Sequence, residues 1–191
     1  MLYTRRGDDG TTEAFDGKAI SALGRRISKS SIVAEALGAL DETNSFLGLA
    51  RGRTNGKSFE IGKEKINFAD LILEIQQNLF IVQAEVAGAE FSITEEKVKR
   101  TEEIVDRIEK ILPPIKNFFI SGATKDGAVL DICRTLARRA ERRVVAASEE
   151  GKIKMSASTL AYLNRLSSLL YALARIVNHL DGVEEIKPDY K

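Results

Sequence analysis

Apolar residues recur every three or four positions in five separate segments of this 191-residue chain. That spacing places side chains on one face of an α-helix, so each segment is expected to bury one face against the others. The fifth segment has leucines at alternating steps of three and four, close to a heptad. Since no stretch reads convincingly as a strand, the chain is predicted to be all-α, an antiparallel five-helix bundle. The segments occupy residues 33–50, 72–86, 94–112, 130–144 and 160–180.

The boundaries of these segments carry helix start and stop signals. Ser30 or Ser31 can cap the first helix, and Thr94, followed by two glutamates, is expected to cap the third. Two prolines end the third helix, and Gly182 follows the fifth. Residues 1–30 have no sustained apolar period and are predicted to form a loop-rich segment wrapped on the body. The length fits a single domain spanning residues 1–191.

The charge balance excludes several classes of protein. Lys and Arg number 29 and Asp and Glu 28, so no overall field favours nucleic acid or an anionic membrane. The single cysteine, Cys133, rules out a disulfide framework, and with the single histidine, His179, it argues against a zinc site. Residues 1–10 lack the apolar core of a signal peptide, and no apolar run reaches the ~20 residues that span a bilayer. We expect a cytoplasmic protein.

The most unusual stretch has five arginines in the ten residues 134–143. Arg134, Arg138 and Arg142 are four residues apart, so they share one helical face and repel one another. A bound polyanion would neutralise such a row, and the planar guanidinium suits phosphate oxygens. The alternative is a solvated helix face in which Glu141 and acids of neighbouring helices pair with the arginines. A nucleic-acid patch is disfavoured by the neutral chain.

A second candidate phosphate site lies near the start of the chain. Residues 3–12 combine glycines, which allow close backbone approach, with hydroxyl and cationic side chains. The same combination also occurs in ordinary turns, and that interpretation stays open. Residues 52–58 resemble a Walker loop, but the stretch is one residue short and follows a helix where a strand is required. We reject it as a P-loop.

Other polar and aromatic residues are ambiguous. Asn164, Arg165 and Ser168 flank the leucines of the fifth segment, and either line a cleft or face water. Asp41 and Asn44 present the same choice on the first segment. Phe118 and the adjacent Phe119 are by default core aromatics. No Ser-His-Asp or Cys-His arrangement is present, so the pattern favours a reaction in which bound ligands supply the reactive atoms.

Taken in order, these motifs make a specific combination. The run Arg-Arg-Ala-Glu-Arg-Arg-Val-Val at 138–145 stands together with Tyr-Thr-Arg-Arg-Gly-Asp-Asp-Gly at 3–10 and Leu-Asn-Arg-Leu-Ser at 163–167. With them the chain resembles the PduO-type ATP:cob(I)alamin adenosyltransferases from end to end. Further matching pieces are residues 35–45, 75–80, 118–122 and 133–137, with Arg26 and Lys29.

The resemblance implies a homotrimer in which ATP and a corrinoid meet at the junction between subunits. Asp41 and Arg134 match a pair that forms a salt bridge across that junction. Phe118 matches an aromatic that packs beneath the corrin ring and displaces its lower axial ligand. The positions that match ATP contacts are Thr4, Arg5, Arg6, Gly7, Thr12, Lys29, Arg138, Arg139, Glu141, Arg142 and Asn164.

The implied reaction transfers the 5′-deoxyadenosyl group of ATP to the cobalt of cob(I)alamin and releases triphosphate. Arg138, Phe118 and Asn164 are the expected catalytic residues, and Mg²⁺ would be bound by the ATP phosphates rather than by protein ligands. A reductase, or an enzyme that uses adenosylcobalamin, would be a natural partner. Neither nucleic acid nor a membrane is expected to bind.

Two alternatives come from other classes of protein. Ser121, Asp131 and Ser168 depart from the family pattern and cluster on the corrinoid side. Ser121 and Ser168 motivate a catalytically impaired ATP-binding or cofactor-delivery module of the same fold. An ion-paired structural bundle that binds no nucleotide is the second alternative.

Overall fold

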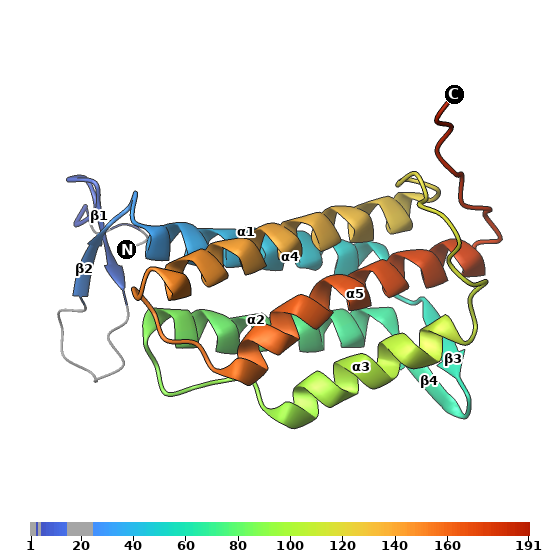
Figure 1. Cartoon of the computed structure of the whole chain (residues 1–191), viewed down its shortest axis with the longest axis horizontal. Coiled ribbons are helices and arrows are strands. Elements are labelled where there is room, and N and C mark those ends of the chain that lie inside the picture. Colours follow the sequence, from blue (N-terminus) through green and yellow to red (C-terminus); the bar gives the residue numbers. More distant parts are fainter. Residues whose placement is uncertain (1–2, 4, 15–24) are drawn as a thin grey trace.

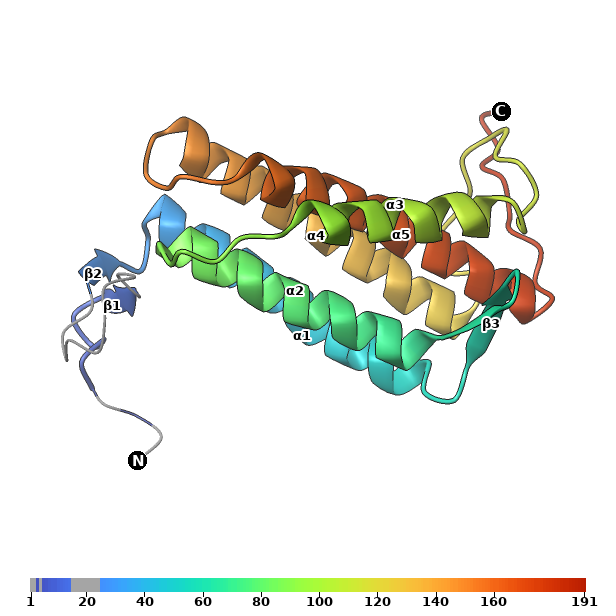
Figure 2. The ribbon, with the colours of Figure 1, turned by 90° about the horizontal axis from the view of Figure 1, so that it is seen from below.

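The computed structural model describes residue 3, residues 5–14 and residues 25–191, and its body is the predicted five-helix bundle (Figure 1). Successive helices alternate in direction, and α4 packs against both α1 and α5. The shorter α3 lies along α5 and runs in the same direction (Figure 2). The helices are α1 (Ile32–Arg53), α2 (Phe68–Ala87), α3 (Glu95–Glu109), α4 (Lys125–Glu149) and α5 (Ala157–Leu180).

Side-chain caps fix the starts of four helices. The predicted cap of α1 is confirmed: Ser31 accepts a hydrogen bond from the amide of Ala34. Asn67, Thr124 and Ser156 cap α2, α4 and α5 in the same way. Thr94 occupies the cap position of α3, but the expectation of a hydroxyl cap is wrong, because its side chain accepts no capping hydrogen bond.

The core lies between the apolar faces that the helical spacing predicted. Leu40, Ile72, Leu130 and Leu163 are fully buried, one from each of the four long helices. Burial of each such side chain contributes about 1.5–3 kcal/mol before its lost entropy is counted. Cys133 lies in the same core, and burial raises the pKa of its thiol to about 12.

Two small hairpins correct the expectation of a chain without strands. The strand β1 (Thr11–Ala14) pairs antiparallel with β2 (Arg25–Ser28), and β3 (Ser58–Ile61) pairs antiparallel with β4 (Glu64–Asn67). Each strand has four residues, which is too short for a two-residue period to stand out from a polar loop. The turn between β3 and β4 contains Gly62 with a φ of 66°, a conformation that suits glycine.

The two hairpins and the tail distinguish the two ends of the bundle. The β1–β2 hairpin stands beyond the end of the bundle where α1 begins (Figures 1 and 2). The loop from residue 110 to 124 and the C-terminal tail, residues 181–191, lie at the other end, together with β3–β4. Among the described residues, no helix is both long and apolar enough to cross a membrane.

Candidate functional site

A cavity of about 940 Å³ opens at the end of the bundle that carries the C-terminal tail. The first half of α4 and the middle of α5 form one side, and the loop around residues 115–121 and the tail form the other. Its volume lies near the upper end of the roughly 300–1,000 Å³ range of small-molecule sites. The lining combines aromatic rings with cations, among them Phe118, Tyr171, Tyr190, Arg134, Arg138 and Arg175.

Phe118 lines this cavity with 81% of its surface exposed. Its default interpretation as a core aromatic is therefore wrong. Phe119 is half-buried and lies 5.2 Å beneath the guanidinium of Arg175. Phe119 thus forms part of the cavity wall, whereas the ring of Phe118 is accessible to a ligand.

The arginines of α4 form two rows with different surroundings. Arg139 is ion-paired with Glu42, and Arg143 lies 3.3 Å from Glu35, so this row rests on acids of α1. Arg138 and Arg142, on the other row, have no ion pair or hydrogen bond to any described part of the chain. The ion-paired alternative therefore describes one row and not the other.

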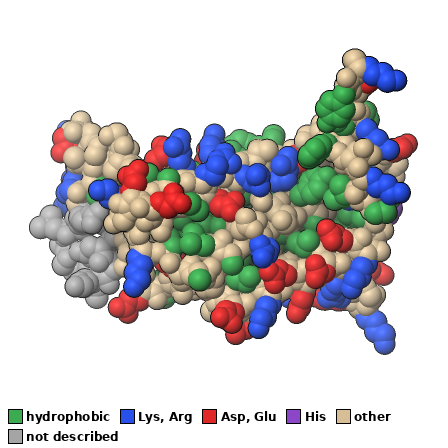
Figure 3. Space-filling model, in the orientation of Figure 1, with side chains coloured by type: hydrophobic (Ala, Val, Ile, Leu, Met, Phe, Trp, Pro, Cys, Tyr) green, Lys and Arg blue, Asp and Glu red, His purple; other side chains and the backbone are tan. Residues whose placement is uncertain are grey.

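The row of Arg138 and Arg142 continues through Arg134 into the cavity. Arg134 and Arg138 both line it, and Arg134 is held there by Asp131 at 3.0 Å and by the ring of Tyr171 at 5.7 Å. Burial raises the pKa of Tyr171, which keeps its hydroxyl protonated at neutral pH. Figure 3 shows a row of cationic side chains along one edge of the molecule, next to an apolar area near the tail.

Asn164 joins α5 to the same face of α4. Its side-chain amide donates to Glu141 at 3.0 Å, and its carbonyl oxygen accepts from Arg165 at 2.7 Å. Arg165 in turn is 2.8 Å from Glu102 of α3. The two predicted site residues Glu141 and Asn164 are therefore in direct contact, one helical turn from Arg138.

The N-terminal segment folds on itself around Lys29, whose ammonium donates to the carbonyl oxygen of Gly7 at 2.8 Å. A Cβ atom at Gly7 would lie 3.0 Å from the Thr11 carbonyl oxygen, which is tighter than most such contacts, so this close approach favours glycine. Arg26 hydrogen-bonds the carbonyl oxygen of Arg6, and Arg5 has a φ of 61°. Thr12 lies in β1 opposite Ile27. Thr4 lies outside the described residues.

Within one chain the N-terminal part of the predicted site and the cavity are not brought together. The hairpin side, with Gly7 and Lys29, stands at one end of the bundle, and the cavity with Phe118 opens at the other (Figures 1 and 2). Asp41 is exposed on α1 without a partner in the described part of the chain, while Arg134 binds Asp131 of its own chain.

Sequence reasoning named Ser168 of α5 but missed the part of the site that the second half of α5 and the tail supply. Arg175 is only 5% exposed and lies 2.9 Å from Glu185, which anchors the tail to α5. Lys187 and Tyr190 follow in the tail and line the cavity. The tail has no apolar periodicity from which a structure could be predicted. An arginine at position 175, inside an otherwise apolar helix, could have indicated a buried charged residue with a specific role.

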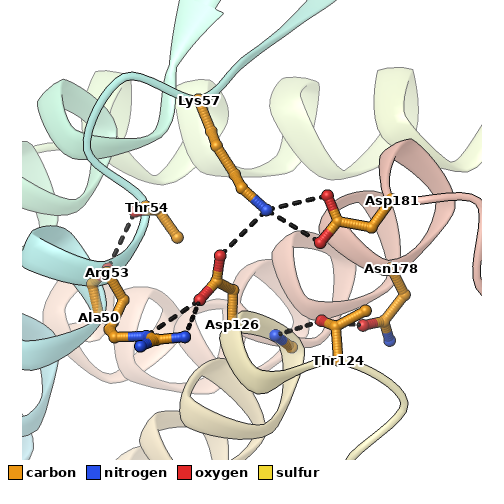
Figure 4. Close-up of polar contacts among 9 residues, drawn as sticks. Ala50, Arg53, Thr54, Lys57, Thr124, Asp126, Asn178 and Asp181 are labelled. Atoms are coloured by element: carbon orange, nitrogen blue, oxygen red, sulfur yellow. Dashed lines mark hydrogen bonds and ion pairs between the residues drawn. The ribbon is translucent and has the colours of Figure 1, made fainter.

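A polar cluster fastens the helix ends beside the cavity (Figure 4). Asp126 binds Arg53 at 2.9 Å and Lys57 at 3.0 Å, and Lys57 also binds Asp181 at 2.9 Å. Burial alone would raise the pKa of Asp126, but hydrogen bonds from the two cations outweigh it and hold the pKa below its ordinary value. The cluster joins the ends of α1, α4 and α5. In the described ranges, no group of three His, Cys, Asp or Glu side chains could hold a metal ion.

Fold and site together define a helical bundle with a cation-lined cavity for a large, partly apolar ligand. Residues 2–177 match the family model described as cobalamin adenosyltransferase. The chain therefore belongs to the cobalamin adenosyltransferase family. This confirms the resemblance and the fold class.

Individual relatives agree with the family. The chain is 36% identical to a corrinoid adenosyltransferase of Bacillus subtilis over 97% of this chain and 91% of that protein. It is 32% identical to the corrinoid adenosyltransferase MMAB of Mus musculus, over 96% of this chain and 75% of the relative. A solved variant of the PduO-type ATP:corrinoid adenosyltransferase from Lactobacillus reuteri, complexed with cobalamin and ATP, superposes with a TM-score of 0.85. That comparison covers 100% of this chain and 97% of the other at 26% identity.

Proposed function

We propose that the chain transfers the 5′-deoxyadenosyl group of ATP to the cobalt of a reduced corrinoid and so forms adenosylcobalamin. The observation that carries the proposal is that Arg138, which has no partner in the described part of the chain, lines an aromatic cavity in a chain of this family. Unpaired guanidinium groups suit the triphosphate, and the apolar rings suit the face of a corrin.

The reaction forms one bond and breaks another. The electron pair of cobalt(I) attacks the ribose 5′ carbon, the cobalt–carbon bond forms, and the carbon–oxygen bond to the triphosphate breaks. No protein nucleophile is needed; the protein aligns the two substrates and stabilises the leaving group. Arg138, Arg142 and Lys29 are the cations assigned to the leaving triphosphate. Mg²⁺ would enter with the ATP phosphates and neutralise part of their charge.

Asn164 and Glu141 are assigned to position the nucleotide beside this row. Their mutual hydrogen bond of 3.0 Å holds both side chains at the α4–α5 boundary. Arg139 is bound to Glu42, so its proposed ATP contact requires that pair to open or to be shared. Thr4, Arg5, Arg6, Gly7 and Thr12 would complete the triphosphate site from the N-terminal segment.

Phe118 is assigned to the lower face of the corrin ring. An exposed ring at the mouth of the cavity can fill the space of the lower axial ligand. A cobalt(II) centre without that ligand is easier to reduce, which favours formation of the cobalt(I) nucleophile.

The separation of the hairpin from the cavity supports a site shared between subunits of a homotrimer. In such an assembly the N-terminal segment of one subunit would reach the cavity side of its neighbour, and Arg134 would exchange Asp131 for the neighbour's Asp41. We further propose a cytoplasmic setting, with a reductase or an adenosylcobalamin-dependent enzyme as partner.

The direct test gives the protein ATP, Mg²⁺ and chemically reduced cobalamin. Formation of the cobalt–carbon bond is followed by the loss of the cobalt(I) absorbance. We expect turnover well above the rate without protein. A rate equal to that background would eliminate the enzyme.

A catalytically impaired ATP-binding or delivery module is the second candidate. Ser121 and Ser168, which depart from the family pattern, both line the cavity. This candidate predicts ATP binding in calorimetry without any change in the spectrum of cobalt(II) cobalamin. The proposed enzyme predicts that ATP and protein together produce that change.

A further inference from the structure

A second hollow of about 300 Å³ adjoins the large cavity. The stretch from residue 112 to 114, the last turn of α5 and the start of the tail form its outer walls. The two hollows share a wall made of Lys116, Asn117, Phe119, Arg175, Glu185 and Lys187. Both volumes fall in the roughly 300–1,000 Å³ range of small-molecule sites, so a ligand in one can extend a substituent into the other.

The shared wall is rigid where it carries charge. Arg175 is bound to Glu185 at 2.9 Å, donates to the carbonyl oxygen of Pro113 at 3.2 Å and lies over the Phe119 ring. The hydrogen bond from the Ile120 amide to the Ile186 carbonyl oxygen, 2.8 Å, fastens the tail to the loop. The hollow is therefore held open by defined contacts rather than by loose packing.

The lining of the smaller hollow has the chemistry of a site for a flat heterocycle. Leu112, Pro113 and Val183 supply apolar walls, and Phe119 supplies an aromatic ring. His179, the single histidine of the chain, adds an imidazole that can hydrogen-bond a ring nitrogen. Lys116 and Lys187 stand on the shared wall, where a phosphodiester linking two halves of a ligand would pass.

The two adjacent phenylalanines connect the hollows. Phe118 lines only the large cavity, whereas Phe119 lines both. If Phe118 fills the lower face of the corrin, the heterocyclic base that binds cobalt there in free cobalamin is displaced on the Phe118 side. We propose that the smaller hollow receives this displaced base, with His179 and Phe119 against its ring. The inference rests on the proposed function and adds a binding site for the lower nucleotide of the substrate.

The test compares cobalamin with cobinamide, which has the same ring and no lower nucleotide. Val183→Trp places a large ring in the smaller hollow without touching the large cavity, since Val183 lines only the former. The matched control is Ile186→Trp, an exposed tail position that lines neither hollow. His179→Ala removes the imidazole and provides the same test should Val183→Trp fail to fold. Dissociation constants for the cobalt(II) forms are measured by absorbance titration in the presence of ATP.

We expect Val183→Trp to weaken cobalamin binding about tenfold, equivalent to about 1.4 kcal/mol, and to leave cobinamide binding within about twofold. The control should change neither constant. Equal weakening of both corrinoids, or unchanged cobalamin binding in both hollow variants, would overturn the inference. The activity of the wild-type protein tests the proposed function separately. If it adenosylates both corrinoids, the proposed function stands whatever the two variants show; if it adenosylates neither, the proposed function is wrong.

Discussion

At the scale of single residues, the two arginine rows of α4 differ in what they contact. Arg139 and Arg143 are neutralised by Glu42 and Glu35 of α1. Arg138 carries a charge that the described part of its own chain leaves unpaired. Like charges one helical turn apart repel each other. A bound anionic ligand would relieve this repulsion, as an acidic side chain of the protein does for Arg139 and Arg143.

We expect Arg138→Ala to lower kcat/KM about 100-fold, the effect of removing one strong donor to a developing charge. The melting temperature should stay nearly unchanged, because the side chain is exposed. Arg143→Ala is the control, since it removes an equally long cation that pairs with Glu35. Steady-state kinetics and thermal unfolding monitored by circular dichroism measure both effects. Loss of the fold in Arg138→Ala, or equal kinetic damage in the control, would contradict the assignment.

Phe118→Ala should leave the dissociation constant for ATP within about twofold and slow the corrinoid step tenfold or more, as loss of an aromatic contact with only one substrate predicts. Calorimetry measures the ATP affinity, and the cobalt(II) spectrum reports removal of the lower ligand. Phe91→Ala makes a suitable control, because Phe91 is also exposed but does not line the cavity. A parallel loss of ATP and corrinoid affinity would remove the proposed role of the ring.

The two residues also show how far sequence reasoning reached. The period of four predicted that Arg134 and Arg138 share a face, because helix geometry alone fixes that relation. The exposure of Phe118 did not follow from its residue type, because phenylalanine is most often buried. Only the resemblance pointed to a ligand-facing ring. Whether these residues bind ATP and corrin stays a prediction.

At the scale of secondary-structure elements, Asp126 ties the start of α4 to Arg53 at the end of α1 and, through Lys57, to Asp181 after α5. Its carboxylate is nearly buried, while Arg53 and Lys57 are partly exposed, so the pairing is discounted for solvent screening. We expect Asp126→Asn to reduce the free energy of unfolding by about 2 kcal/mol at neutral pH. Urea unfolding measures the change. The exposed Asp106→Asn, on α3, should change stability by less than about 0.5 kcal/mol.

The same cluster has a defined dependence on pH. The pKa of Asp126 is lower in the folded protein than its ordinary value of 3.8. The carboxylate therefore stabilises the fold fully above that value, and the stabilisation is lost as the pH falls through the folded pKa. The difference between wild type and Asp126→Asn should narrow as pH is lowered from about 5 to 2. A difference that stays constant over that interval would show that charge is not its origin.

Long elements were predictable and short ones were not. Each helix repeats its apolar spacing over several turns, so α5 could be placed from leucines alone. A four-residue strand such as β3 gives two alternations at most, and its pairing depends on Gly62 and on burial of Phe59 against Phe68 at the start of α2. That contact is tertiary and has no local signature in the sequence.

At the scale of the whole molecule, the hairpin and the cavity are held at opposite ends of a rigid bundle. If the site is shared between subunits, Lys29→Ala and Arg138→Ala damage different halves of it. Co-expression of the two variants should then restore activity, because about one quarter of all sites in randomly assembled trimers combine two intact halves. Specific activity of the purified mixture, compared with each variant alone, measures the recovery. A mixture as inactive as its parents would place both halves in one subunit.

Cys133 is not expected to react with thiol-directed labels, so a cysteine introduced elsewhere can be labelled selectively. The only sulfhydryl in the sequence is sealed in the core, and its pKa of about 12 keeps it in the unreactive protonated form. A fluorophore coupled to Tyr190→Cys, at the exposed tip of the tail, would therefore attach at one position without first removing the native cysteine. The fluorescence of this label could follow corrinoid binding in real time, in a protein whose core packing is that of the wild type.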